Sequence, residues 1–93
     1  MFYNVKGRNY REMGKYTKAE DCYIHSIWLL PERIYPYYLL TKLYADPANY
    51  QPEKMRDAAI AVLKKEPKVH SLAIREMRDE VKKILKEKGI VYE

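Results

Sequence analysis

Residues 3–31 read YNVKGRNYREMGKYTKAEDCYIHSIWLLP, and residues 37–67 repeat the spacing of this stretch. The offset is 34 residues in the first half of the pattern and 36 in the second, because the second copy carries two extra residues. The paired positions, first copy and then second, are Tyr3 and Tyr37, Gly7 and Thr41, Tyr10 and Tyr44, Ala19 and Met55, Tyr23 and Ala59, and Pro31 and Pro67. A spacing of this length is typical of chains built from repeated helix pairs.

The pattern resembles the tetratricopeptide repeat, a helix-turn-helix motif of about 34 residues. The first copy matches the motif at Tyr3, Gly7, Tyr10, Ala19, Tyr23 and Pro31, and the second at Tyr37, Leu40, Tyr44 and Pro67. The resemblance implies an all-α fold, a right-handed α-solenoid of two helix pairs plus a C-terminal capping helix, five helices in all. It implies a single domain over residues 1–93, with repeat 1 at about 1–33, repeat 2 at about 34–67 and the capping helix at about 71–89.

Local start and stop signals place the helices. Gly14, which can adopt the left-handed conformation past a helix end, closes a first helix over residues 2–13. Thr17 and Glu20 form a capping-box pattern that starts a second helix running to Leu30. The other signals predict a third helix from about Ile34 to Asp46-Pro47, a fourth from Pro52 to before Pro67, an extended link at residues 68–70, and a fifth helix over 72–88 between Ser71 and Gly89.

Apolar residues recur with the helical period, and none of the stretches alternates as a strand does. The small Gly7 should let the second helix approach the first closely. The residues expected to face inward are Ala19, Tyr23, Ser26, Ile27 and Leu30, then Tyr37, Leu40, Leu43 and Tyr44, then Met55, Ala59, Val62 and Leu63, and finally Ile74, Met77, Val81, Ile84 and Leu85.

Composition and motifs favour a non-catalytic domain. The chain has 47% hydrophobic and 33% charged residues, no apolar run long enough to span a membrane and no signal peptide, so we expect it to be soluble. Its net charge is +5, but acidic residues are interleaved with the basic ones and no nucleic-acid motif is present. Cys22 and His25 alone cannot complete a structural zinc site. We therefore expect no enzyme activity, no cofactor, no metal and no nucleic-acid partner.

A binding groove follows from the first resemblance, since the first helix of each tetratricopeptide repeat lines a concave surface. This geometry implies that the groove is lined by Asn4, Arg8, Arg11, Tyr35, Tyr38 and Lys42. Three cations and an amide beside two aromatics suit an acidic segment or a chain-terminal carboxylate of a protein partner. The alternative is that these residues are ordinary solvated side chains.

Residues 14–86 also resemble the C-terminal repeat tail of certain bacterial O-antigen ligase or polymerase-like membrane proteins. The matching stretches include LPERIYPYYLL at residues 30–40, AIREMR at residues 73–78, and the shorter runs at 14–16, 19–20, 42–44 and 67–69. The resemblance implies that the chain is the tail of a longer protein of the bacterial inner membrane. A second interpretation stays open, in which the chain is a purely structural cap of a longer helical array.

The N-terminal end of the repeat array should be uncovered, because no helix precedes the first one. Phe2 and Tyr3 lie in this first helix, and Ile24 and Trp28 form an i, i+4 apolar pair off the main stripe of the second helix. Uncovered apolar groups of this kind often mark an interface. We expect weak association into a symmetric homodimer through these four residues.

Overall fold

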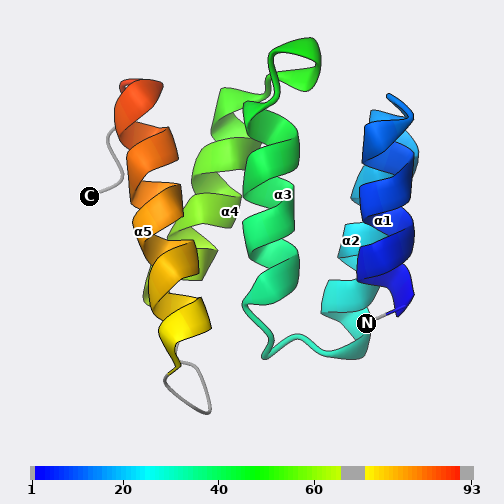
Figure 1. The fold of residues 1–93 in the computed structure, drawn as a ribbon, viewed down its shortest axis with the longest axis horizontal. Helices are drawn as coiled ribbons and strands as arrows, with labels where there is room; N and C mark the ends of the chain where they lie inside the picture. The colour runs from blue at the N-terminus through cyan, green and yellow to red at the C-terminus, as the bar shows by residue number, and fades with distance from the viewer. Residues whose placement is uncertain (1, 66–70, 91–93) are drawn as a thin grey trace.

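The computed structural model of the chain describes residues 2–65 and 71–90, and over these ranges the fold is all-helical, as predicted. The elements are α1 (Phe2–Glu12), α2 (Tyr16–Leu29), α3 (Tyr35–Ala45), the short 3-10 helix η1 (Pro47–Asn49), α4 (Pro52–Lys64) and α5 (Leu72–Glu87). Viewed along the shortest axis, α1, α3 and α5 stand side by side, with α2 and α4 behind them (Figure 1). The helices thus form two layers in a body of 30 × 30 × 19 Å.

Glycine closes the first and last helices in the predicted way. Gly14 has a φ of 74°, its N–H donates to the carbonyl of Arg11 at 2.9 Å, and the N–H of Lys15 donates to Tyr10 at 2.8 Å. These two bonds satisfy carbonyls that the end of α1 would otherwise leave unpaired. Gly89, with a φ of 67°, ends α5 in the same manner.

The predicted capping box at Thr17 is wrong. Helix α2 begins at Tyr16, its N-cap is Lys15, and no side chain caps this end. Thr17 therefore lies inside the helix, because the Gly14 turn brings the chain into helical geometry sooner than the pattern suggests. Glu20 instead accepts a hydrogen bond from the hydroxyl of Tyr44 and pairs with Lys54 at 3.5 Å.

The close approach of α1 and α2 depends on Gly7, as predicted. A Cβ atom at this position would lie 2.5 Å from Cε1 of Tyr23, well inside van der Waals contact. Tyr23 is fully buried, so its ring occupies the space that a larger residue at position 7 would need. Glycine is thus the residue that fits this contact.

The second helix pair reverses the sizes of these two residues. Thr41 takes the position of Gly7 and Ala59 that of Tyr23, and both are fully buried. The hydroxyl of Thr41 donates to the carbonyl of Tyr37 at 2.9 Å, which satisfies this buried polar group. A larger residue thus stands on α3 where the first copy has glycine, and a smaller one on α4 where the first copy has tyrosine.

The predicted inward stripes form the core with one exception. Leu30 is 49% exposed, because α2 ends at Leu29 and the chain turns away before Leu30 can continue the stripe. The predicted link at residues 68–70 and the predicted end signal Pro67 lie outside the described residues. The fully buried members of the core include Ala19, Tyr23, Leu43, Met55, Ala59, Val62, Val81 and Leu85.

Helix α5 is held by its own cap and by a side chain that reaches α4. The hydroxyl of Ser71 accepts from the N–H of Ile74 at 3.3 Å, which is the predicted N-cap. Arg78 donates from Nε to the carbonyl of Val62 at 3.0 Å and from Nη2 to that of Lys65 at 2.6 Å. A cation on these terminal carbonyls also complements the negative end of the α4 dipole.

Candidate functional site

Of the predicted groove residues, Tyr35, Tyr38 and Lys42 lie together on α3, and Arg11 of α1 reaches Asp46 at the end of α3. We call the surface on which α1, α3 and α5 stand side by side the α1–α3–α5 face, and its described members are Arg8, Arg11, Tyr35, Tyr38, Lys42, Asp46 and Glu80. Arg8 is exposed, and the other predicted members are partly buried. The side chain of Asn4 lies outside the described part of the chain.

Tyr38 and Lys42 of α3 hold the carboxylate of Glu80 from α5. The Tyr38 hydroxyl donates to Oε2 of Glu80 at 2.5 Å, and Nζ of Lys42 lies 3.6 Å from Oε1. Lys42 also stands over the Tyr38 ring, with Nζ 5.3 Å from the ring centroid. Burial, and then the hydrogen bond to Glu80, raises the pKa of Tyr38 well above its ordinary value, so the phenol remains a donor.

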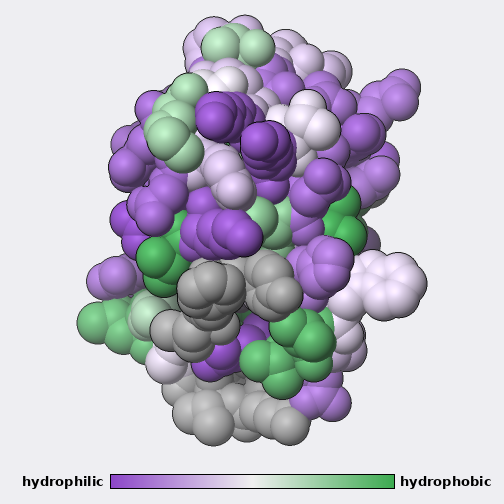
Figure 2. Space-filling model, turned by 90° about the vertical axis from the view of Figure 1, so that its right-hand side faces the viewer, coloured by the Kyte–Doolittle hydropathy of each residue, from purple (hydrophilic) through white to green (hydrophobic). Residues whose placement is uncertain are grey.

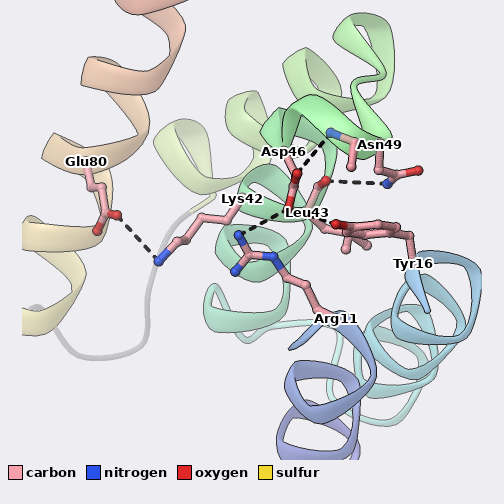
Figure 3. A network of polar contacts seen from close by, with 8 residues as sticks. Arg11, Tyr16, Lys42, Leu43, Asp46, Asn49 and Glu80 are labelled. Atoms are coloured by element: carbon pink, nitrogen blue, oxygen red, sulfur yellow. Dashed lines mark hydrogen bonds and ion pairs between the residues drawn. The ribbon is translucent and has the colours of Figure 1, made fainter. Parts of the chain in front are cut away.

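Arg11 and Asp46 form a second polar contact on the same face, between α1 and the end of α3. Nη2 of Arg11 lies 3.9 Å from Oδ2 of Asp46, which also accepts from the Tyr16 hydroxyl at 3.3 Å. The other oxygen of Asp46 accepts from the N–H of Ala48 at 3.0 Å and so caps η1. Figure 3 shows both contacts, with Lys42 reaching toward Glu80 and Arg11 toward Asp46.

Hydrogen-bond donors near α1 outnumber the acceptors that meet them. Nε of Arg11 and the hydroxyl of Tyr23 are buried and have no hydrogen-bond partner among the described residues. Arg8 makes no ion pair within the same ranges. Burial raises the pKa of Tyr23 to about 12, so this group too is a donor at neutral pH. The two buried donors are closed to an external ligand, so the exposed guanidinium of Arg8 is the group on the α1 side that suits a carboxylate.

Sequence reasoning missed the acidic members of the face, Asp46 and Glu80. Asp46 was interpreted only as a helix stop, although an Asp at an N-cap position also leaves a second oxygen to accept from elsewhere. Glu80 directly precedes Val81 of the buried stripe, so its place beside the core could have been inferred from the helical period. Its partners on α3 are 38 to 42 residues away and carry no local signal.

A surface hollow lies elsewhere, along α5, with a volume of about 630 Å³. The described residues that line it belong to α5 and the Ser71 cap: Ser71, Leu72, Ile74, Arg75, Arg78, Asp79 and Lys82. Since the described lining residues all belong to one helix and its cap, the hollow encloses a small molecule poorly. The convergent side chains of the α1–α3–α5 face are the better candidate site.

The end of the molecule formed by α1 and α2 carries exposed apolar groups, and two of the four predicted ones, Ile24 and Trp28, are among them. Trp28 is 81% exposed, and Ile24, Leu29, Leu30 and Val5 are also exposed. Figure 2 views this end and shows hydrophobic patches between hydrophilic side chains. The side chains of Phe2 and Tyr3 lie outside the described residues, so the prediction that they take part in self-association stays a prediction.

The structure also describes the remaining candidate groups. Cys22 is buried, and burial raises the pKa of its thiol, which disfavours the reactive thiolate. Over residues 2–65 and 71–90, no three His, Cys, Asp or Glu residues are grouped as a metal site would need. Within the same ranges, none of the helices has both the length and the apolar character that crossing a membrane requires.

Comparison of the chain with protein-family models, with curated proteins and with solved structures finds no match. The two resemblances drawn from the sequence therefore stay predictions, and the proposed function rests on the geometry of the α1–α3–α5 face.

Proposed function

We propose that this chain is a non-catalytic protein-interaction module of the tetratricopeptide type. In this proposal the pairs α1–α2 and α3–α4 are two repeats of a right-handed solenoid, and α5 is the capping helix. The close contact between Gly7 and Tyr23 supports it, because the motif places its small and aromatic residues at these positions. The layer formed by α1, α3 and α5 would then be the binding layer.

The ligand proposed for this face is an acidic segment or a chain-terminal carboxylate of a protein partner. One observation carries the proposal: Tyr38 and Lys42 already hold a carboxylate, that of Glu80. Two side chains that bind one carboxylate in the free chain are chemically suited to bind another. The exposed guanidinium of Arg8 extends the same chemistry toward α1.

Titration with a glutamate-rich peptide, followed by amide chemical shifts, tests this function. We expect the first shifts at Arg8, Arg11, Tyr38 and Lys42, and a weaker response at higher salt because exposed charges are screened. The same peptide with glutamine in place of glutamate is the control. Shifts confined to α5, or equal for both peptides, would contradict the proposal in favour of nonspecific attraction.

On the second resemblance, we propose that the module is the tail of a larger O-antigen ligase-like membrane protein. Its proposed role there is to bind a protein partner or another part of the same protein. Co-purification of the full-length protein from membranes with and without residues 1–93 tests this role. Identical sets of co-purifying proteins would count against it.

The alternative function, a structural cap of a longer helical array, is favoured by the way α5 closes the fold. Arg78 ties α5 to the end of α4, and the outward residues of α5 are mostly charged. If α5 serves only as a cap, its deletion should lower stability, and charge changes on the α1–α3–α5 face should leave partner binding unaltered.

A further inference from the structure

Glu80 makes an unusual pair of contacts for a residue on an exposed helix surface. Its carboxylate is shared by a phenol and an ammonium group of one helix, Tyr38 at 2.5 Å and Lys42 at 3.6 Å. The two donors are one helical turn apart, so both side chains lie on the same side of α3. They form a pair of donors that the carboxylate of another helix has already engaged.

We infer that Tyr38 and Lys42 form the carboxylate subsite of the α1–α3–α5 face, and that Glu80 fills this subsite while no partner is bound. The inference rests on the proposed function, because it assigns the same face an anchoring point and an internal competitor. The ligand class is an acidic peptide, one of whose carboxylates takes the place of Glu80.

The pair is weak enough to be exchanged. The side chains of Lys42 and Glu80 are 34% and 45% exposed, so solvent and salt screen the charge interaction. The core of α5 is anchored separately, by the buried Val81 and Leu85. Glu80 can therefore leave α3 by a side-chain rotation, without undocking the helix.

The surroundings of the subsite favour a peptide over a small anion. Tyr35 lies beside Tyr38, with ring centroids 6.1 Å apart and a tilt of 31°, so an aromatic surface adjoins the carboxylate position. Further along the face, toward α1, Arg8 makes no ion pair with any described residue. An extended acidic chain could use the subsite, the aromatic surface and Arg8 together, whereas a small anion uses the first alone.

Occupation by Glu80 lowers the apparent affinity of the face, because a ligand binds only the fraction of molecules in which the subsite is open. Glu80→Gln keeps the shape of the side chain and removes its charge. We expect this substitution to raise the affinity for a fluorescein-labelled glutamate-rich peptide by roughly three- to tenfold, measured by fluorescence anisotropy on the whole chain.

Glu76→Gln is the matched control, since Glu76 is an exposed residue of the same helix and its substitution changes the net charge equally. It should leave the affinity within about twofold, because long-range attraction alone is screened. Adding Tyr38→Phe to Glu80→Gln should cancel most of the gain, since the subsite then loses its hydroxyl donor. Melting curves establish that each variant folds, and Glu80→Ala replaces Glu80→Gln if the latter does not.

The outcomes separate the inference from the function on which it rests. A gain for Glu80→Gln that Glu76→Gln lacks supports the subsite. Equal affinity of the wild type and of both variants overturns the subsite and leaves the proposed function standing. Failure of every protein, Glu80→Gln included, to bind the glutamate-rich peptide overturns both.

Discussion

The contact between Gly7 and Tyr23 makes Gly7→Ala the most decisive test of the fold. An alanine methyl group at position 7 would lie 2.5 Å from Cε1, 2.8 Å from Cδ1 and 3.1 Å from Cζ of Tyr23. The ring is fully buried and cannot swing into solvent. The methyl group therefore has to push α1 and α2 apart or force the ring off its rotamer.

Two opposing terms set the magnitude. Alanine in place of glycine inside a helix normally stabilises by about 0.5–1 kcal/mol. Overpacking a close contact costs about 1–3 kcal/mol. We expect the second term to win, with a net loss of roughly 1–2 kcal/mol and a fall in Tm of roughly 5–15 °C for a domain of this size.

Thermal and urea unfolding followed by far-ultraviolet circular dichroism measures this loss. Asn9→Ala is the control, because Asn9 is exposed on the same helix and alanine there should stabilise by a few tenths of a kcal/mol. In the double variant Gly7→Ala with Tyr23→Leu, the two costs should not add, since the smaller side chain makes room for the methyl group. If Gly7→Ala proves as stable as the wild type while Asn9→Ala behaves as expected, the close approach of α1 and α2 is refuted.

Three further outcomes are expected. Arg78→Ala should lower the free energy of unfolding in urea by about 1.5–3 kcal/mol, because the carbonyls of Val62 and Lys65 lose a charged donor. Arg78→Lys should not restore the lost stability, since one ammonium group cannot reproduce the two-bond geometry, and full rescue by lysine would contradict this role. Burial raises the pKa of Tyr23 to about 12 from 10.0, so the Tyr23 hydroxyl loses its proton in the unfolded chain at a lower pH than in the folded chain. The stability that this difference contributes is complete below pH 10 and should be lost as the pH rises to about 12. A Tyr23→Phe variant whose stability falls equally steeply over this range would exclude Tyr23 as the cause. Trp28→Lys should reduce self-association in sedimentation experiments, since Trp28 is 81% exposed, and a wild-type monomer that persists at millimolar concentration would argue against the dimer.

The sequence predicted those features of the fold that depend on nearby residues. Gly14 and Ser71 mark helix ends because their conformation or side chain satisfies backbone groups within a few residues. The helical period of the apolar residues predicted most of the buried positions, because it depends only on residues three or four positions apart. The prediction that Leu30 is buried was wrong, because the apolar stripe was extended past Leu29, the residue at which α2 ends.

The wrong role predicted for Glu20 and the missed role of Glu80 share a physical cause. A carboxylate can serve a local cap or a distant donor, and the sequence shows only the local possibility. The structure gives Glu20 to Tyr44, 24 residues away, and Glu80 to Tyr38, 42 residues away. The cations of the candidate face were expected from the tetratricopeptide resemblance, whereas the acids that pair with two of them, Arg11 and Lys42, depend on how the helices pack.

The packing of each helix mainly on its neighbours in the chain also has a consequence for folding. Helix α1 contacts mainly α2, α3 packs chiefly with α4, and α5 rests on α4 and α3. A pair of neighbouring helices can form with few contacts between distant segments, so little loop-closure entropy opposes the first steps of folding. We therefore expect the chain to fold rapidly. One buried core that extends from Ala19 on α2 to Leu85 on α5 then joins the helix pairs, so we expect the whole domain to unfold in a single cooperative transition.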